Sequence, residues 1–196
     1  MLKRLFDIIA SSIGLLLLSP FFVFITIWIK STSKGGVFYF QKRIGKGNLP
    51  FKLFKFRTMY IDADKKGLIT VGMRDSRITP TGYFLRKYKL DELPQLLNVL
   101  NGSMSLVGPR PEVEKYTKLY NETQLKVLSV KPGITDLASI KYSNENEILE
   151  KFDNPEKGYI EQVMPDKLKL NLEYIQKQSF WFDIKIIFAT LFKIAI

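Results

Sequence analysis

The pattern of apolar and polar positions begins with one long apolar run from Leu5 to Ile29, interrupted only by Asp7 and a few small polar residues. As one straight helix it would be about 37 Å long, enough to cross the ~30 Å hydrocarbon core of a bilayer. Ser19 and Pro20 lie inside the run, and a proline there removes one helical hydrogen bond and predicts a kink. We expect the Ser19 hydroxyl to bond a backbone group that is freed at the bend.

The charges that flank this run bear on its membrane arrangement. Lys3 and Arg4 precede it and Lys30 and Lys34 follow it, whereas a spanning helix normally carries an excess of cations on one side. Split at the proline, neither half is long enough to cross the hydrocarbon core. We therefore favour a re-entrant helix–break–helix over residues 1–34 that enters and leaves by the same face. A kinked spanning helix is the alternative.

Two stretches that are aromatic-rich or alternate apolar and polar residues come next, at Val37–Arg43 and Phe51–Arg57, with a glycine-rich segment between them. This pattern predicts a β-hairpin with a flexible tip. Lys55 and Arg57 are two positions apart, so both project from one strand face. They either face a phosphate group or act as juxtamembrane cations attracted to anionic lipid. Their tight spacing favours the phosphate.

Helical spacing returns after two adjacent acids, Asp91 and Glu92, with Pro94 at an early helical position. The apolar residues expected to bury one face of this helix are Leu93, Leu96, Leu97 and Leu100. The positive end of the helix dipole would favour the ionised form of an acid at this place. Adjacent residues do not share a helix face, so the two acids are expected to have separate roles. A helix cap beside a solvated acid is the alternative.

Two arginines stand near these acids in the sequence pattern. Arg86 precedes Asp91 by five residues, and it either pairs with that acid or binds the same anion. Arg110 lies between Pro109 and Pro111, so its backbone is severely restricted. Such rigidity suits a guanidinium that is held in a fixed pose against a phosphate or a planar ring.

The remaining pattern predicts helices over Glu112–Leu128 and Leu168–Gln178. The aromatic-rich end from Phe180 predicts either an interfacial helix or a helix docked on the N-terminal run. The expected fold class is α+β and mostly helical. We expect a membrane anchor over residues 1–34 and a cytosolic or interfacial domain with a small β-hairpin over residues 35–196.

Composition excludes several kinds of chemistry. The 196 residues include no cysteine and no histidine, which excludes disulfides, Ser–His and Cys–His triads and metal sites built on those residues. Acid–base or nucleophilic work would fall to carboxylates, lysine, tyrosine or hydroxyls. The net charge of +11 indicates an anionic partner such as nucleic acid, an anionic bilayer or a phosphorylated substrate.

Taken together, these segments resemble the bacterial sugar transferase family, small monotopic phosphoglycosyl transferases that load a phosphosugar onto polyprenyl phosphate. The resemblance runs from Lys3 to about Gly133. It is carried by Lys3-Arg4-Leu5-Phe6-Asp7, Ser19–Pro20, Lys55-Phe56-Arg57-Thr58-Met59, Arg77-Ile78-Thr79 with Gly82, Leu90-Asp91-Glu92-Leu93-Pro94-Gln95 and Ser105-Leu106-Val107-Gly108-Pro109-Arg110-Pro111.

The resemblance implies roles for individual residues. It implies that Asp91 is the nucleophile and that Glu92 is its acidic partner, associated with Mg²⁺. It implies a nucleotide-binding loop at Pro109, Arg110 and Pro111. The remaining substrate-binding residues that it implies are the basic positions Lys55, Arg57 and Arg86.

The expected reaction follows from these implied roles. Asp91 would attack a UDP-sugar, UMP would leave, and polyprenyl phosphate (undecaprenyl phosphate) would take the sugar phosphate from the aspartyl intermediate. Such a step starts the assembly of a bacterial capsule, O-antigen or glycoprotein glycan. The expected location is the cytosolic face of the bacterial inner membrane, in a minimal monotopic form that contacts membrane lipid, with a homodimer left open.

The chain departs from the common family pattern after Thr135. Asp136 stands where many members have a glycine, and Ser143–Asn144 stands where an Arg–Asn pair is usual, with Lys141 as a candidate substitute for the arginine. Two other functions remain as alternatives. A membrane-tethered nucleic-acid-binding protein predicts a steep salt dependence of binding, but it gives the paired acids no role. A non-catalytic scaffold predicts no UMP release.

Overall fold

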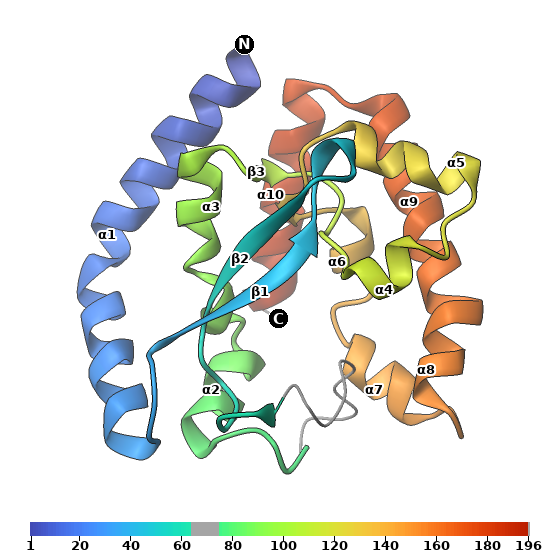
Figure 1. The fold of residues 1–196 in the computed structure, drawn as a ribbon. Coiled ribbons are helices and arrows are strands. Elements are labelled where there is room, and N and C mark those ends of the chain that lie inside the picture. Colours follow the sequence, from blue (N-terminus) through green and yellow to red (C-terminus); the bar gives the residue numbers. More distant parts are fainter. Residues whose placement is uncertain (64–74, 196) are drawn as a thin grey trace.

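The computed structural model describes residues 1–63 and 75–195, which form a mostly helical domain with little sheet (Figure 1). The strands are β1 (Phe38–Ile44), β2 (Pro50–Phe56), β3 (Ser105–Val107) and β4 (Gly133–Thr135). The α-helices are α1 (Leu2–Thr32), α2 (Pro80–Lys87), α3 (Gln95–Asn101), α4 (Glu114–Thr117), α5 (Glu122–Leu125), α6 (Leu137–Lys141), α7 (Glu145–Glu150), α8 (Pro155–Gly158), α9 (Met164–Lys177) and α10 (Phe180–Ala195). Shorter turns are the 3₁₀ segments η1 (Lys46–Asn48), η3 (Leu90–Glu92) and η4 (Lys126–Ser129), and the π-helical η5 (Tyr159–Val163). The predicted α+β, mostly helical class is confirmed.

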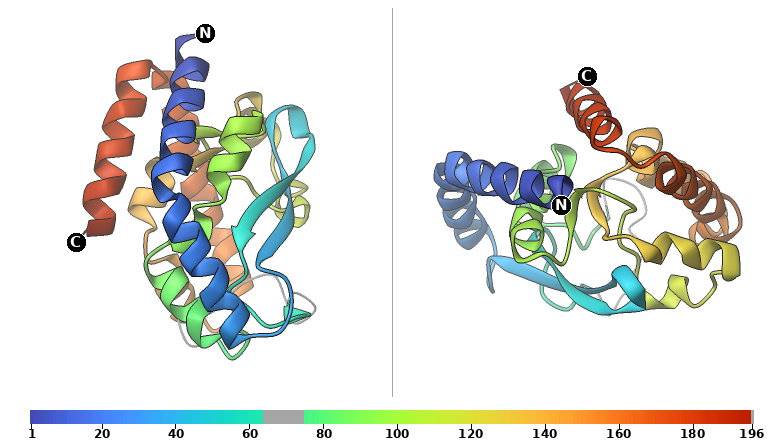
Figure 2. Two further views of the ribbon diagram at one scale, coloured as in Figure 1. Left: turned by 90° about the vertical axis from the view of Figure 1, so that its left-hand side faces the viewer. Right: turned by 90° about the horizontal axis from the view of Figure 1, so that it is seen from above.

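Helix α1 is continuous from Leu2 to Thr32 and contains Pro20. Its axis changes direction near its middle (Figures 1 and 2). The predicted helix–break–helix is thus corrected to a bend within one helix. Pro20 has no N–H for the carbonyl of Leu16, four residues earlier, and the Ser19 hydroxyl donates to that oxygen at 2.8 Å. The carbonyl of Leu16 therefore keeps a hydrogen-bond donor at the bend, and the helix can continue through the proline.

A narrow seam of α1 is docked on the domain along its whole length. At its start, Asp7 accepts hydrogen bonds from the Ser105 hydroxyl at 2.9 Å and the Leu106 N–H at 3.0 Å. Near its end, Ile25 and Ile29 are buried, and the Thr32 hydroxyl lies 2.7 Å from the Thr81 hydroxyl. These contacts tie both ends of the helix to the same body.

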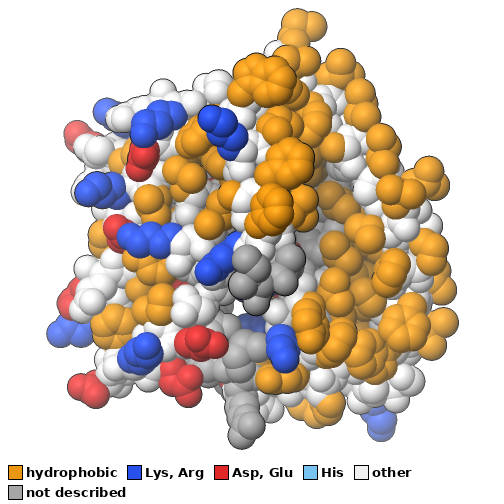
Figure 3. Space-filling view, turned by 180° about the vertical axis from the view of Figure 1, so that it is seen from behind, with side chains coloured by type: hydrophobic (Ala, Val, Ile, Leu, Met, Phe, Trp, Pro, Cys, Tyr) orange, Lys and Arg blue, Asp and Glu red, His pale blue; other side chains and the backbone are white. Residues whose placement is uncertain are grey.

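The rest of the α1 surface is apolar and exposed. By length and composition α1 is the one helix, among the described residues, that could cross a membrane, and only 11% of its most apolar window is buried. The exposed apolar side chains of α1 include Leu5, Ile9, Ile13, Leu16, Leu17, Phe21, Phe24 and Ile27. Seen from behind, hydrophobic side chains gather in a broad area with cations mostly outside it (Figure 3).

The predicted β-hairpin is confirmed. β1 and β2 pair antiparallel, and the register sets Tyr39 opposite Lys55. The side-chain amide of Asn98, on α3, accepts from the Phe54 N–H at 2.9 Å and donates to the Lys52 carbonyl at 2.8 Å. An asparagine thus occupies the free edge of β2 and fixes the hairpin to α3.

A second, parallel pair of strands, β3 and β4, was not predicted. It depends on a close approach of two glycines, since a Cβ atom on Gly133 would lie 2.1 Å from the nitrogen of Gly108. This pair sets the start of the segment that leads into Pro109. The single helix predicted over Glu112–Leu128 was wrong, because the chain there forms the separate pieces α4, α5 and η4.

The C-terminal part packs behind β3 and β4. The helix predicted over Leu168–Gln178 is confirmed by α9, and α10 follows it. One face of α10 is buried through Asp183 and Ile186, while its other face exposes Trp181, Phe188, Leu191 and Phe192. Phe180 also meets Phe6 of α1, with ring centroids 5.4 Å apart. The docked-helix interpretation of this segment therefore holds for one of its faces, and an exposed apolar face remains.

Candidate active site

The two adjacent acids lie on η3, a turn that joins α2 to α3. Leu90 and Leu93 pack against a small core that contains Ile25 and Ile29 of α1. Residues three apart share one side of a helical turn, so Asp91 and Glu92 face away from α1, toward β2. The prediction that leucines bury one face of the helix after these acids is only partly confirmed. The leucines there are partly exposed, and the fully buried residues of α3 are Gln95, Asn98 and Val99.

Glu92 is held by two cations. Its Oε1 atom accepts from Lys55 Nζ at 2.8 Å and also from Arg110, whose second guanidinium nitrogen reaches Oε2 at 3.0 Å. Burial opposes ionisation here, but the charges of Arg110 and Lys55 outweigh it and hold the pKa of Glu92 well below its usual range. In turn, Glu92 raises the pKa of Arg110. Two cations and one carboxylate thus form a hydrogen-bonded group with one positive charge in excess.

Asp91 differs from its neighbour because no cation among the described residues is within hydrogen-bond distance of its carboxyl group. The residue is 5% exposed, and the structure shows no hydrogen bond to its carboxyl group from any described residue. Its nearest cation, Lys55 Nζ, lies 4.0 Å from Oδ2. Burial raises the pKa of Asp91, although the charge of Lys55 acts in the opposite direction. The predicted helix-dipole preference for the ionised form is therefore outweighed by the loss of water.

The other predicted cations divide into two groups. Arg86 makes no ion pair with Asp91, yet its charge lowers the pKa of that acid, so it lies in the same region. Arg57 lies elsewhere: its guanidinium donates to the carbonyls of Lys34 and Ser33 at the end of α1. The structure thus brings Lys55 and Arg86 to the acids and directs Arg57 to the end of α1.

The Pro109–Pro111 loop carries Arg110 to Glu92, and two acids that we did not predict support it. Asp136 accepts from the backbone N–H of Arg110 at 3.1 Å and also caps α6 through the N–H of Ser139. These two contacts give the carboxylate at position 136 a structural role. Lys141 does not reach the loop, because it is paired with Asp166 at 2.6 Å.

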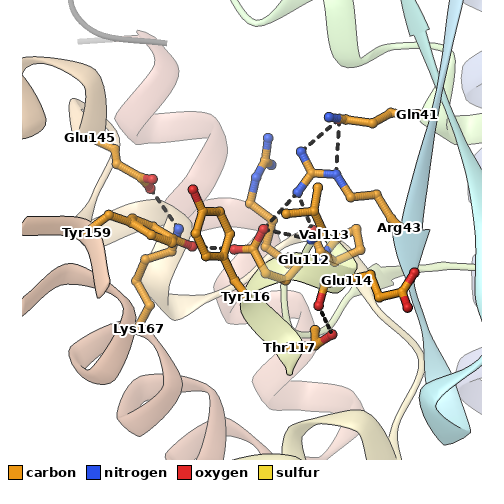
Figure 4. A network of polar contacts seen from close by, with 12 residues as sticks. Gln41, Arg43, Glu112, Val113, Glu114, Tyr116, Thr117, Glu145, Tyr159 and Lys167 are labelled. Atoms are coloured by element: carbon orange, nitrogen blue, oxygen red, sulfur yellow. Dashed lines mark hydrogen bonds and ion pairs between the residues drawn. The ribbon is translucent and has the colours of Figure 1, made fainter. Parts of the chain in front are cut away.

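Glu112 is the second supporting acid and lies at the centre of a polar network behind the loop (Figure 4). Arg43, on β1, donates to Glu112 at 3.1 Å and to the carbonyl of Pro111 at 3.0 Å. The hydroxyl of Tyr159, in η5, donates to the other oxygen of Glu112. The sequence pattern places Glu112 only at the start of a predicted helix. The contacts that give Glu112 its role come from segments far away in the sequence.

The residues near Asp91 do not form a ready magnesium site. Mg²⁺ usually takes one or two carboxylates together with substrate phosphates. Here both oxygens of Glu92 accept hydrogen bonds from cations, and a metal ion at Glu92 would have to displace Lys55 or Arg110. Among the described residues no group of three or more His, Cys, Asp and Glu is placed to hold a metal. In this arrangement Glu92 does not fit the role of a metal ligand.

Comparisons with known proteins agree with this arrangement of motifs. The model of the family described as bacterial sugar transferase matches residues 1–196. The chain is 41% identical over 98% of its length to UDP-glucose:undecaprenyl-phosphate glucose-1-phosphate transferase of Escherichia coli strain K12, of which it spans 40%. It is 38% identical over 97% of its length to the exopolysaccharide production protein ExoY of Rhizobium meliloti, of which it spans 84%.

A third relative has a different sugar in its name. The chain is 33% identical over 97% of its length to UDP-N-acetylgalactosamine-undecaprenyl-phosphate N-acetylgalactosaminephosphotransferase of Aeromonas hydrophila, of which it spans 43%. Relatives with different sugars match almost the whole chain, so these comparisons identify the family rather than a sugar. The chain belongs to the bacterial sugar transferase family.

Proposed function

We propose that this protein transfers a sugar-1-phosphate from a UDP-sugar to undecaprenyl phosphate and releases UMP. The names of the relatives support the reaction class and both substrates. The observation that carries the proposal is the contrast between the two acids. Glu92 is fully paired, whereas the buried carboxyl group of Asp91 has no hydrogen bond from the described residues and faces Lys55 at 4.0 Å. A carboxylate that accepts no hydrogen bond and lies beside fixed cations is suited to attack a phosphorus atom.

In the proposed first step, an Oδ atom of Asp91 attacks the phosphorus that bears the sugar. The bond between that phosphorus and the bridging oxygen breaks, and UMP leaves with the electron pair. In the second step, a phosphate oxygen of undecaprenyl phosphate attacks the aspartyl phosphosugar, and the carboxylate of Asp91 is released. The Lys55–Glu92–Arg110 group holds its charges in place throughout, so no reorganisation is needed when negative charge develops.

We also propose that α1 enters only one leaflet, from the cytosolic face of the inner membrane. Both ends of α1 are docked on the same domain, through Asp7 at one end and Thr32 at the other. A helix that spans the bilayer would carry its two ends to opposite sides. The exposed apolar faces of α1 and α10 extend over one side of the molecule and suit contact with lipid (Figure 3).

A requirement for Mg²⁺ stays part of the proposal. Because Glu92 is occupied, we place no step on the metal. Its entry with the phosphates of the donor is consistent with the usual preference of Mg²⁺ for phosphate oxygens and few protein ligands. Removal of Mg²⁺ by a chelator is expected to stop UMP release, and steady turnover in excess chelator would contradict this part.

A screen for UMP release tests the reaction. Purified protein is mixed with Mg²⁺, undecaprenyl phosphate and each of a set of UDP-sugars, and UMP is measured. At least one donor is expected to give turnover. Incubation with that donor alone should also give a protein whose intact mass has increased by one phosphosugar. No turnover with any donor would overturn the proposed reaction. Turnover without a covalent species would overturn the two-step route.

The topology has a separate test, which uses the absence of native cysteine. A Leu2→Cys variant carries a single thiol, and labelling with a membrane-impermeant reagent is compared from each side of sealed vesicles. Labelling only from the cytosolic side is expected. Pro20→Ala, which restores the missing N–H, should bias the segment toward spanning. Labelling of the native helix from the outer side would contradict the one-leaflet arrangement.

A further inference from the structure

The backbone of the Pro109–Pro111 loop is held from outside on both sides of its arginine. The N–H of Arg110 donates to Asp136 at 3.1 Å. The carbonyl of Pro111 accepts from Arg43, on β1, at 3.0 Å. The two prolines have no N–H and a fixed φ angle, so the loop has little conformational freedom of its own. The direction in which the Arg110 side chain leaves the loop therefore depends on these outside contacts.

The contact from Arg43 depends in turn on Glu112. One oxygen of Glu112 accepts from Arg43 at 3.1 Å and from the Val113 N–H at 2.8 Å. The other oxygen accepts from the Tyr159 hydroxyl (Figure 4). The side chains of Arg43 and Glu112 are only 19% and 15% exposed, so a carboxylate oxygen that lost its donor here would be unfavourable. Tyr159 thus completes the set of donors that holds Glu112 against Arg43.

Tyr159 is itself held firmly. It is buried and opens the π-helical segment η5. Such π-helical turns are rare, and they occur frequently at functional sites. Its ring packs against the ring of Tyr116, with centroids 5.0 Å apart, and the amine of Lys167 lies 5.3 Å from its centroid. Burial and the charge of Glu112 raise the pKa of the Tyr159 hydroxyl, which therefore remains a hydrogen-bond donor.

We propose that Tyr159 is a positioning residue for Arg110. It acts through Glu112 and Arg43 on the loop that carries this guanidinium. The inference rests on the proposed function, because Arg110 belongs to the cations beside Asp91 in that reaction. A preorganised charge supports a reaction only in the correct place, and a small displacement is enough to slow the chemical step.

Tyr159→Phe tests the proposal, since it removes one hydroxyl and keeps the ring. The kcat for UMP release, expressed per folded molecule, is expected to fall about 10-fold, as for the loss of one hydrogen bond to a charged group. The KM for the UDP-sugar should change by less than about 2-fold, because the displaced charge acts mainly on the transition state. Tyr116→Phe is the matched control. It removes the neighbouring hydroxyl, which also donates to a glutamate, Glu156, at 3.3 Å, and its kcat should stay the same.

A double-mutant cycle separates positioning from a purely structural role. Arg110→Ala removes the group that Tyr159 is proposed to position. Adding Tyr159→Phe to that variant is therefore expected to lower kcat by less than about 2-fold more. A further 10-fold loss in the Arg110→Ala background would overturn the inference. A Tyr159→Phe variant with a lower melting temperature but an unchanged kcat would overturn it too.

Hydrogen exchange gives a readout that needs no turnover. The backbone N–H of Arg110 is bonded to Asp136, so its exchange reports how firmly the loop is held. Tyr159→Phe is expected to speed exchange over residues 110–113 by about 10-fold, and Tyr116→Phe to leave it unchanged. Unaltered exchange in Tyr159→Phe would overturn the inference. Failure of the proposed function looks different: the wild-type protein would release no UMP with any donor, while exchange in the loop would still respond to Tyr159→Phe.

Discussion

Two buried polar clusters of this molecule are alike in composition and burial but differ in how their acids are paired. The docking cluster joins the start of α1 to the domain through Lys3, Asp7 and Asp183. The acid site comprises Lys55, Asp91, Glu92 and Arg110 on β2, η3 and the Pro109–Pro111 loop. Each buries carboxylates next to cations, with Asp7, Asp91 and Asp183 all at most 5% exposed.

The difference lies in how completely the acids are paired. In the docking cluster, Asp7 accepts from a hydroxyl and a backbone N–H, while Asp183 accepts from Lys3 at 2.5 Å and from the Tyr174 hydroxyl at 2.7 Å. In the acid site only Glu92 is satisfied. A buried carboxyl group without hydrogen bonds is unfavourable for stability, so its presence at Asp91 indicates chemistry rather than structure.

Asp91→Asn is the sharpest test of this contrast. The substitution keeps the size of the side chain but removes the nucleophilic oxygen, so UMP release is expected to fall by at least about 10⁴-fold. The variant should remain folded, because no hydrogen bond is lost. Residual activity above a hundredth of the wild-type rate would exclude Asp91 as the nucleophile.

Asp7→Ala tests the other cluster. It leaves two buried donors unpaired and frees the start of α1, so the free energy of unfolding is expected to fall by about 3 kcal/mol. The rate per folded molecule should stay within about 2-fold. Denaturant titration in detergent measures the first quantity. Asp153→Ala, an exposed acid, is the control. A large loss of rate without a loss of stability would give Asp7 a role in the reaction.

Glu92→Gln measures what the charge of the paired acid contributes to the rate. It keeps the shape of the side chain and removes the charge that holds Lys55 and Arg110. The rate is expected to fall by about 10²-fold, in the range for loss of one preorganised electrostatic group. Lys55 would then be free to approach Asp91 and lower its pKa, so the acid limb of the kcat/KM profile should move to lower pH. An unchanged profile would show that Glu92 does not control the charge around Asp91.

The smallest expected effect concerns pH and stability. Because the pKa of Asp91 is raised above 3.8 on folding, the folded protein binds more protons than the unfolded chain between the two values. The stabilisation from this group is therefore complete below pH 3.8 and is lost as the pH rises through the raised pKa. Compared with Asp91→Asn, the wild-type protein should lose stability over that window. Parallel stability curves would contradict the raised pKa.

Local sequence patterns were sufficient for some of the predictions that the structure confirms. Alternation and a glycine-rich tip were enough for the hairpin. The family resemblance, rather than a local pattern, implied that Lys55 and Arg110 belong to the same site as the paired acids, and the structure brings them together. The β3–β4 pair was missed because its strands have three residues each and depend on the contact of Gly108 with Gly133, far away in the chain. The leucines of α3 were expected to face a core, but they lie beside α1, whose outer side is itself exposed.

Non-local contacts account for the rest of the site. Arg57 follows β2 in the expected manner, but its partners are backbone carbonyls at residues 33 and 34, which no spacing rule identifies. Asp136 and Glu112 support the Pro109–Pro111 loop through bonds to other segments, so their roles were equally hidden.

The seam that docks α1 along its length also bears on the kind of membrane that suits this protein. A spanning helix must match its hydrophobic length to the thickness of the bilayer, and each ångström of mismatch has an energetic cost. In the proposed one-leaflet arrangement the depth of Asp91 is set by contacts within the protein, such as those of Asp7 and Thr32. Membranes of different thickness would then suit the protein equally well, because the fit of the anchor to the bilayer would not limit where it binds.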